Sequence, residues 1–323
     1  MTEPSTPKRN PHDDLRELIE GVPALPTEFG EAVRDRLSKF PGPERPLGRL
    51  EAHLAWLADV QKRPLPNVGQ PLVAVFAGTH DVAGGSAIKV AQERVVGVTQ
   101  GSAAVRGIAG NLGAAFKVYE FGIEVPAADM RAGPSLSARE TAAAFAFGME
   151  VVAEGADIIA LGSIGAGAVS AAAAIARGLY GGSADYWAKA DGEVGAERVK
   201  AVEQAAEANS GALSDPLSVL SAFGGRDIAG MAGAIIAARY QAIPVVLDGF
   251  VTCAAAAVLH AVDPDAVAHC RVGAATAEFA QGGLLDRMGM EPLLDVRAGV
   301  GDGTGAALAL VALKAGCAGL STL

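Results

Sequence analysis

The sequence has few of the residues that build disulfides or metal sites. Its 323 residues include 3 cysteines and 5 histidines. Cys253, Cys270 and Cys317 are odd in number and lie far apart among alanines and valines, so we expect small buried side chains in a reducing compartment. The histidines show no metal-ligand spacing with acids or cysteines. We therefore predict no metal site.

Charge is also scarce, and positive charge is the scarcer kind. Charged residues make up 19% of the chain, and 26 basic against 36 acidic residues give a formal net charge of -10. Such a chain repels polyphosphate backbones, so we expect no nucleic-acid partner. Residues 1–14 are polar and lack the apolar run of a secretory signal, which predicts a cytoplasmic location.

A continuous membrane-spanning run is absent as well, although the mean hydropathy is +0.30. The longest stretch without charge, residues 158–176, approaches the length of a span. Glycines and serines dilute its interior, so we interpret it as a strand, a turn and a helix. We expect no membrane partner.

Glycine is abundant, with 41 residues and no Gly-X-Y repeat, which excludes collagen. Short apolar runs at 72–77, 117–123, 158–161 and 245–247 are mostly followed by glycine and then by alanine-rich helical stretches. This alternation predicts an α/β fold, a three-layer Rossmann-like parallel sheet with helices on both faces.

The domain organisation follows from the change of pattern near residue 66. We expect a disordered tail at 1–12, a small N-terminal helical lead-in at 13–65 that is punctuated by prolines, and the α/β domain at 66–323.

Two glycine clusters, residues 162–167 and 299–305, each come directly before a predicted helix. In parallel α/β sheets, ligands bind where strand ends meet helix N-termini, whose free N–H groups attract anions. Neither cluster has the lysine and hydroxyl of a P-loop or a dinucleotide G-x-G-x-x-G spacing. The pattern alone leaves phosphate binding and tight-turn packing equally open.

Three polar side chains stand out at the same edge. Asp302 lies between two glycines, which suits a general base, although a helix-capping aspartate has the same pattern. His80 and Asp248 follow strands and could face a ligand, or form structural hydrogen bonds instead. Glu278 and Arg271 are accounted for by pairing at the surface.

At this point the ordered motifs resemble those of the nicotinate-nucleotide:dimethylbenzimidazole phosphoribosyltransferases, over about residues 10–320. The matching stretches are PLGRLEAHLAWLA (46–58), PLVAVFAGTHDVA (71–83), ARGLYGGSADYW (176–187), LSDPLSVLSAFGGRDIAGMAGAIIAA (213–238), IPVVLDGFVTCAAAAVLHA (243–261) and GDGTGAALAL (301–310).

The resemblance implies transfer of phosphoribose from nicotinate mononucleotide to dimethylbenzimidazole or a related lower base. The products are α-ribazole 5'-phosphate and nicotinate, and the pathway is cobalamin biosynthesis. It also implies no cofactor, and a homodimer with part of its contact at residues 13–65.

The resemblance also assigns site residues. Asp302 matches the general base, a glutamate in the family's G-E-G-T-G loop. His80, Ser86 and Asp248 are expected in the base pocket. The phosphate- and ribose-binding residues are expected to be Gly162, Ser163, Gly165, Gly167, Arg198, Thr276, Gly301 and Gly303.

The chain departs from the family at these loops. Asp302 is one methylene shorter than the family's glutamate, Ser163 replaces another glutamate, and Ala168, Val169 and Ser170 replace an Asn-Thr-Thr run. Two hypotheses follow. One is an enzyme of the same reaction type, and the other is a catalytically impaired homologue that binds a benzimidazole, a nucleotide or a partner protein without turnover.

Overall fold

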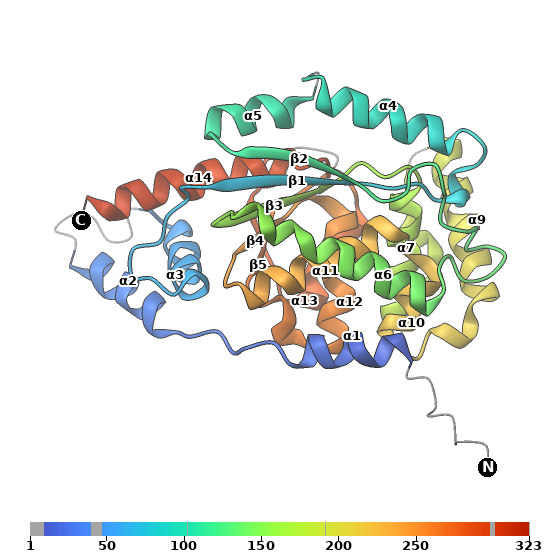
Figure 1. Cartoon of the computed structure of the whole chain (residues 1–323), viewed down its shortest axis with the longest axis horizontal. Coiled ribbons are helices and arrows are strands. Elements are labelled where there is room, and N and C mark those ends of the chain that lie inside the picture. The colour runs from blue at the N-terminus through green and yellow to red at the C-terminus, as the bar shows by residue number, and fades with distance from the viewer. Residues whose placement is uncertain (1–9, 40–46, 102, 191, 298–300, 323) are drawn as a thin grey trace, which may run out of the picture.

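The computed structural model describes residues 10–39, 47–101, 103–190, 192–297 and 301–322. Within them, a 6-stranded parallel sheet has the order β2-β1-β3-β4-β5-β6 (Figure 1). The strands are β1 (Pro71–Ala77), β2 (Ala115–Glu120), β3 (Ile158–Ser163), β4 (Val245–Leu247), β5 (Cys270–Ala274) and β6 (Pro292–Leu294). The predicted α/β parallel sheet is confirmed, and β5 and β6 are additions to it.

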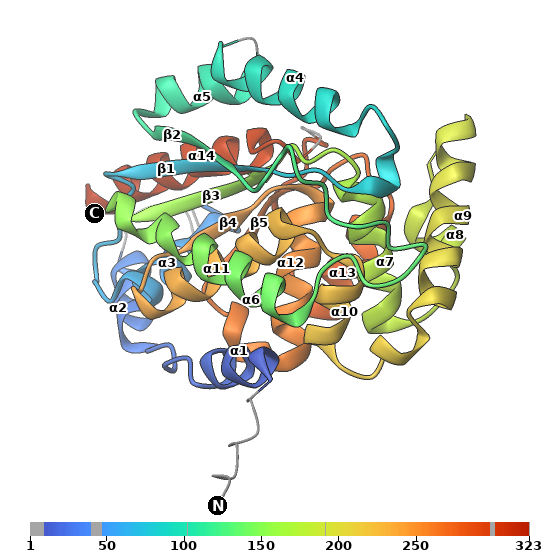
Figure 2. The same ribbon diagram turned by 45° about the vertical axis from the view of Figure 1, so that its right-hand side comes forward.

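Helices connect the strands and cover both faces of the sheet (Figure 2). They are α1 (Pro11–Glu20), α2 (Glu28–Ser38), α3 (Leu50–Gln61), α4 (Ala87–Thr99), α5 (Ala104–Leu112), α6 (Ala138–Gly148), α7 (Ala168–Tyr180), α8 (Ala184–Ala188), α9 (Gly192–Ala208), α10 (Pro216–Phe223), α11 (Arg226–Tyr240), α12 (Gly249–Val262), α13 (Ala280–Met288) and α14 (Thr304–Ser321).

The core lies on both sides of the sheet because successive strand residues point to opposite faces. In β1, Leu72 and Phe76 join an apolar cluster with side chains of α7, α10, α11 and α12. Val73 and Val75 join a second cluster with side chains of α3, α5 and α14. Every residue of β1 is buried, which explains its continuous apolar sequence.

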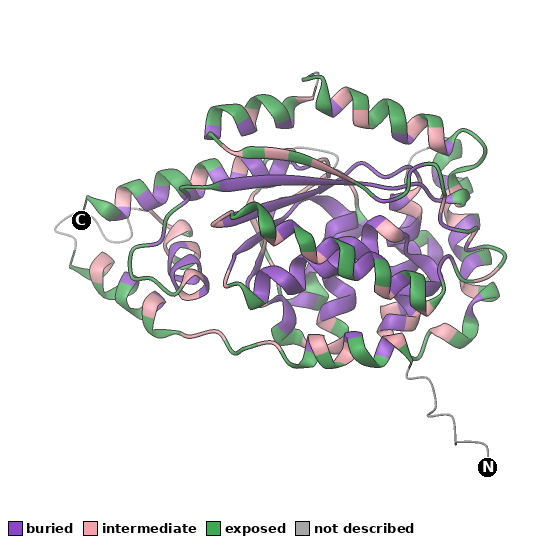
Figure 3. Ribbon diagram, in the orientation of Figure 1, coloured by how far each residue is buried: buried purple, intermediate pink, exposed green. Residues whose placement is uncertain are grey.

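Glycine allows helices α6 and α11 to approach each other at backbone contact. A Cβ atom on Gly148 would lie 1.9 Å from the carbonyl oxygen of Gly230, and one on Gly233 would lie 1.9 Å from that of Phe145. Most of α11 is buried as a result (Figure 3). Part of the glycine excess therefore serves helix packing.

The N-terminal helices share the core of the α/β domain. Leu54 and Leu57 of α3 are fully buried in the cluster that contains Leu310 of α14. Helix α1 begins at Pro11, with Asn10 as its N-cap, so the end of the expected tail at residue 12 is wrong. Residues 1–9 lie outside the described residues. The division into 13–65 and 66–323 remains a prediction.

Residues 158–176 form β3 and the first turns of α7, so their interpretation as strand, turn and helix is confirmed. In the described part of the chain, α14 is the one helix with the length and hydropathy of a membrane span. It packs against β3 and β5, as a core helix does. The three cysteines are buried and unpaired, as expected.

Candidate functional site

The two glycine clusters meet at the carboxyl end of β3. The Ser163 amide donates a hydrogen bond to the Gly301 carbonyl oxygen at 2.6 Å. A Cβ atom on Gly162 would lie 2.4 Å from the Gly303 nitrogen, so Gly162 allows two backbones to touch. Gly301 and Gly303 both have positive φ angles, of 88° and 100°. Residues 299 and 300 of the second cluster lie outside the described residues.

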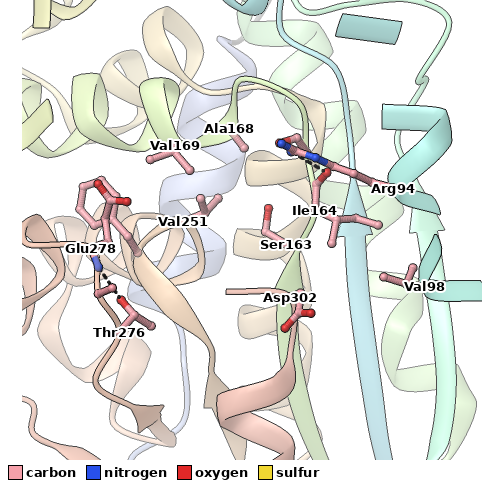
Figure 4. Close-up of a pocket in the computed structure, with 13 residues that line it drawn as sticks. Arg94, Val98, Ser163, Ile164, Ala168, Val169, Val251, Thr276, Glu278 and Asp302 are labelled. Carbon is pink, nitrogen blue, oxygen red and sulfur yellow. Dashed lines mark hydrogen bonds between the residues drawn. The ribbon is translucent and has the colours of Figure 1, made fainter. Parts of the chain in front are cut away.

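Asp302 stands at this junction, directly before α14. Its Oδ1 atom accepts a hydrogen bond from the Thr304 amide at 3.0 Å. The side chain is half-buried and lines a cavity of about 520 Å³ (Figure 4). Oδ2 makes no hydrogen bond to the described residues. Capping and facing a ligand are therefore compatible, because one carboxylate oxygen holds the loop and the other remains available.

The cavity beside Asp302 has mainly apolar walls. It is lined by Arg94, Val98, Ser163, Ile164, Gly165, Ala168, Val169, Phe250, Val251, Thr276, Ala277, Glu278 and Asp302. The Ser163 hydroxyl is buried here without a hydrogen-bond partner among the described residues. An apolar cavity with a few polar groups at its edge suits a flat heteroaromatic ring.

A second cavity of about 770 Å³ adjoins the first and shares Arg94, Gly165 and Val169 with it. Its lining includes the basic side chains of Arg94, Arg131, Arg198 and Lys200. Gly167 also lines it, as the N-cap of α7, and offers no side-chain cap to the first amides of that helix. Cations beside a helix N-terminus suit a phosphate group.

The predicted residues Arg198 and Thr276 are both hydrogen-bonded to Glu278. Arg198 Nη1 donates to Glu278 Oε1 at 2.7 Å, and the Thr276 hydroxyl donates to Gln281 Oε1 at 2.9 Å. The expected surface pairing of Glu278 with Arg271 is wrong. Arg271 lies instead over the Trp56 ring, 4.6 Å from its centroid.

Asp248 is fully buried beneath the Asp302 loop and lines neither cavity, so its expected place in the base pocket is corrected. Its Oδ2 atom accepts hydrogen bonds from the Gly303 and Gly305 amides at 2.7 and 3.2 Å. Its Oδ1 atom has no partner among the described residues. Burial, together with the nearby Asp302 charge, raises the pKa of Asp248 to about 7. Asp248 therefore holds the loop that carries Asp302.

Because the pKa of Asp248 is raised, part of the free energy of unfolding is expected to depend on pH. The variant Asp248→Asn, which has no proton to release at this position, should lack that dependence. Between the ordinary value of 3.8 and about 7, the folded protein keeps a proton that the unfolded chain has released. The free energy of unfolding of the wild type should therefore fall, relative to that of the variant, as pH rises from about 4 to about 7. Urea unfolding at several pH values measures the difference, and a difference independent of pH would contradict the prediction.

His80 and Ser86 also lie outside the linings of these two cavities, and their expected place in the base pocket stays a prediction. His80 is 3% exposed, and its Nε2 atom lies 3.0 Å from Asp227 Oδ1 in a buried pair. Ser86 is exposed at the start of α4. The buried pair leaves His80 a structural role, the alternative that the sequence had left open.

The remaining histidines offer no ligand cluster. Burial lowers the pKa of His53 to about 4 and that of His269 to about 3, which keeps both rings neutral. His269 Nε2 is hydrogen-bonded to the Ile235 carbonyl oxygen at 2.9 Å. No group of three or more His, Cys, Asp or Glu side chains that could hold a metal ion was found in the described part of the chain.

Several cavity residues have no distinguishing signal in the sequence. Arg94 lies on a helix of mixed composition, far in sequence from either glycine cluster. Phe250 and Val251 belong to a continuous apolar helix, where nothing separates a cavity-lining side chain from a core one. Only the position directly after Asp248, at the end of β4, could have indicated them.

Comparison with known proteins gives consistent matches over most of the chain. Residues 22–323 match the family model DBI_PRT, described as a phosphoribosyltransferase. A protein of Methylocella silvestris is 46% identical over 316 residues, which cover 95% of this chain and 93% of the relative. A Brucella anthropi protein is 43% identical over 315 residues, with 94% and 92% covered. Both are named nicotinate-nucleotide--dimethylbenzimidazole phosphoribosyltransferase.

The fold matches a solved structure as well. The crystal structure of an enzyme of the same name from Thermus thermophilus superimposes with a TM-score of 0.83. The two sequences are 28% identical, and the match covers 91% of this chain and 96% of that one.

Proposed function

Because the chain belongs to the phosphoribosyltransferase family of these relatives, we propose that it transfers phosphoribose from nicotinate mononucleotide to dimethylbenzimidazole or a related base. The products are α-ribazole 5'-phosphate and nicotinate, and the reaction belongs to cobalamin biosynthesis. The observation that carries this proposal is the Asp302 carboxylate in a mainly apolar cavity, beside a second cavity lined by basic side chains.

The chemistry requires one proton acceptor. The bond between the anomeric carbon and the pyridinium nitrogen breaks, and its electron pair stays on the departing ring, which becomes neutral at that nitrogen. A benzimidazole nitrogen forms the new bond from the opposite face, with inversion. Its other ring nitrogen then gives up a proton, which Asp302 Oδ2 accepts as general base.

The neighbouring residues supply binding and orientation. We assign the mononucleotide phosphate to the basic cavity, where Arg198 and the amides following Gly167 provide donors. Glu278 keeps the Arg198 guanidinium at the cavity rim through their 2.7 Å hydrogen bond. Asp248 holds the Asp302 loop through the Gly303 and Gly305 amides. Exact placement of a reacting group is worth several orders of magnitude in rate.

The direct test is to incubate the purified full-length protein with nicotinate mononucleotide and dimethylbenzimidazole. We expect formation of both α-ribazole 5'-phosphate and nicotinate, in equal amounts, and no product when either substrate is omitted. A folded protein that forms no product would contradict the proposal. Binding of the base without turnover, measured by calorimetry, would then favour the catalytically impaired homologue.

We also propose that the protein is a homodimer, with part of the contact in residues 13–65. The support is the family resemblance, together with the position of α2 at the outer edge of the molecule (Figure 1), where Gly30 and Val33 are the residues of that helix that are buried. Light scattering at micromolar concentration should give about twice the monomer mass. A monomer would contradict this proposal without affecting the proposed reaction.

A further inference from the structure

Arg94 reaches from α4 to the boundary between the two cavities, and it lines both. Its Nη1 atom donates hydrogen bonds to the carbonyl oxygens of Gly165, at 2.8 Å, and Ile164, at 3.3 Å. These bonds fix the guanidinium against the first glycine cluster (Figure 4). The side chain is therefore oriented by the same loop that lines both cavities through Gly165.

The positive charge of Arg94 is not neutralised by a neighbouring carboxylate. Among the described residues, no Asp or Glu oxygen lies within 4.0 Å of its guanidinium, whereas Arg198 is bonded to Glu278. The Nε and Nη2 atoms of Arg94 make no hydrogen bond to the described residues. A planar edge of free N–H donors is suited to a carboxylate or a phosphate.

Arg94 is also the one basic side chain among the residues that line the mainly apolar cavity. Figure 4 shows Arg94 and Asp302 at opposite ends of the cavity wall, with Ser163 between them. An inverting displacement requires the incoming base and the departing ring to lie on opposite sides of the anomeric carbon. In the proposed reaction the incoming base lies beside Asp302, and this arrangement would put the departing ring on the side of Arg94.

We propose that Arg94 binds the carboxylate of the pyridine ring and thereby selects the nicotinate mononucleotide over its nicotinamide counterpart. This inference rests on the proposed function. The two substrates differ only in the substituent on the pyridine ring. In one it is a carboxylate, and in the other it is an amide, which carries no negative charge. The ion pair with Arg94 therefore forms with only one of them. Both carry the same phosphate, so a phosphate contact of Arg94 would not discriminate between them.

The test compares the two mononucleotides as donors, with dimethylbenzimidazole as acceptor, in the wild type and in Arg94→Met. Methionine keeps much of the stem volume and removes the charge. We expect kcat/KM for nicotinate mononucleotide to fall about 10- to 100-fold, mainly through KM, as for a lost charged hydrogen bond. The value for nicotinamide mononucleotide should stay within about threefold, so that the preference is lost.

Lys89→Met on the same helix is the matched control. Lys89 is exposed, pairs with Glu93 at 3.8 Å and lines neither cavity, so its replacement should leave the preference unchanged. An equal loss for both donors in Arg94→Met would indicate a phosphate contact and overturn the inference. An unchanged preference would overturn it too, with the proposed reaction intact. A wild type that uses neither donor would contradict the proposed function itself, and this inference with it.

Discussion

Replacement of Asp302 by asparagine is expected to lower kcat by about 100-fold or more, with little change in KM for nicotinate mononucleotide. A general base contributes about 100- to 10,000-fold to the rate. The asparagine side chain has the same shape as that of aspartate. Its oxygen can still accept the hydrogen bond that Asp302 Oδ1 now accepts from the Thr304 backbone N–H at 3.0 Å. The loop should therefore stay in place while the proton acceptor is lost. Initial rates at saturating dimethylbenzimidazole measure the effect.

Asp302→Glu is the variant to compare with Asp302→Asn, because it introduces the glutamate that the phosphoribosyltransferase family carries at the matching position. It retains a carboxylate, and we expect its kcat to stay within about tenfold of the wild-type value. The two variants together separate the charge of the group from its length. An asparagine variant within about threefold of the wild type would show that Asp302 is not the base.

The strands differ in how far the sequence could predict them. Strands β1 and β4 are continuous apolar runs because both faces of the sheet are covered at those positions, and β4 has the predicted bounds. Strand β5 contains Arg271, and β6 has only three half-buried residues, so neither has an apolar run that stands out. Strand β2 is an edge strand with partly exposed residues, and its predicted start was two residues late.

The site was predictable where backbone conformation demands a particular residue, and less so elsewhere. The glycines around Asp302 have positive φ angles or lie against another backbone, and such positions require glycine, which can be recognised in the sequence. The partner of a long side chain cannot be recognised in this way. Arg94 reaches a loop 70 residues further along the chain, and Arg198 and Glu278 meet across 80 residues. The tertiary fold alone determines such partners.

The second large effect concerns stability and comes from the glycines that serve packing. Gly233→Ala should lower the free energy of unfolding by about 3 kcal/mol or more, at the upper end of the range for overpacking. A Cβ atom there would lie 1.9 Å from the Phe145 carbonyl oxygen and 2.7 Å from its carbon. Both belong to the backbone of α6, so no rotation of a side chain can relieve the clash. The midpoint of urea unfolding, at constant slope, measures the loss.

Gly110→Ala in α5 is the matched control, since a Cβ atom at that helical position would meet nothing within 4 Å. Alanine is the better helix former, by about 1 kcal/mol, and it also restricts the unfolded chain, so this variant should be slightly more stable than the wild type. The same substitution is thus expected to act with opposite sign at two helical positions. Equal effects at both would mean that helix propensity alone decides the outcome, and that the close approach of α6 and α11 does not limit the side chain at position 233.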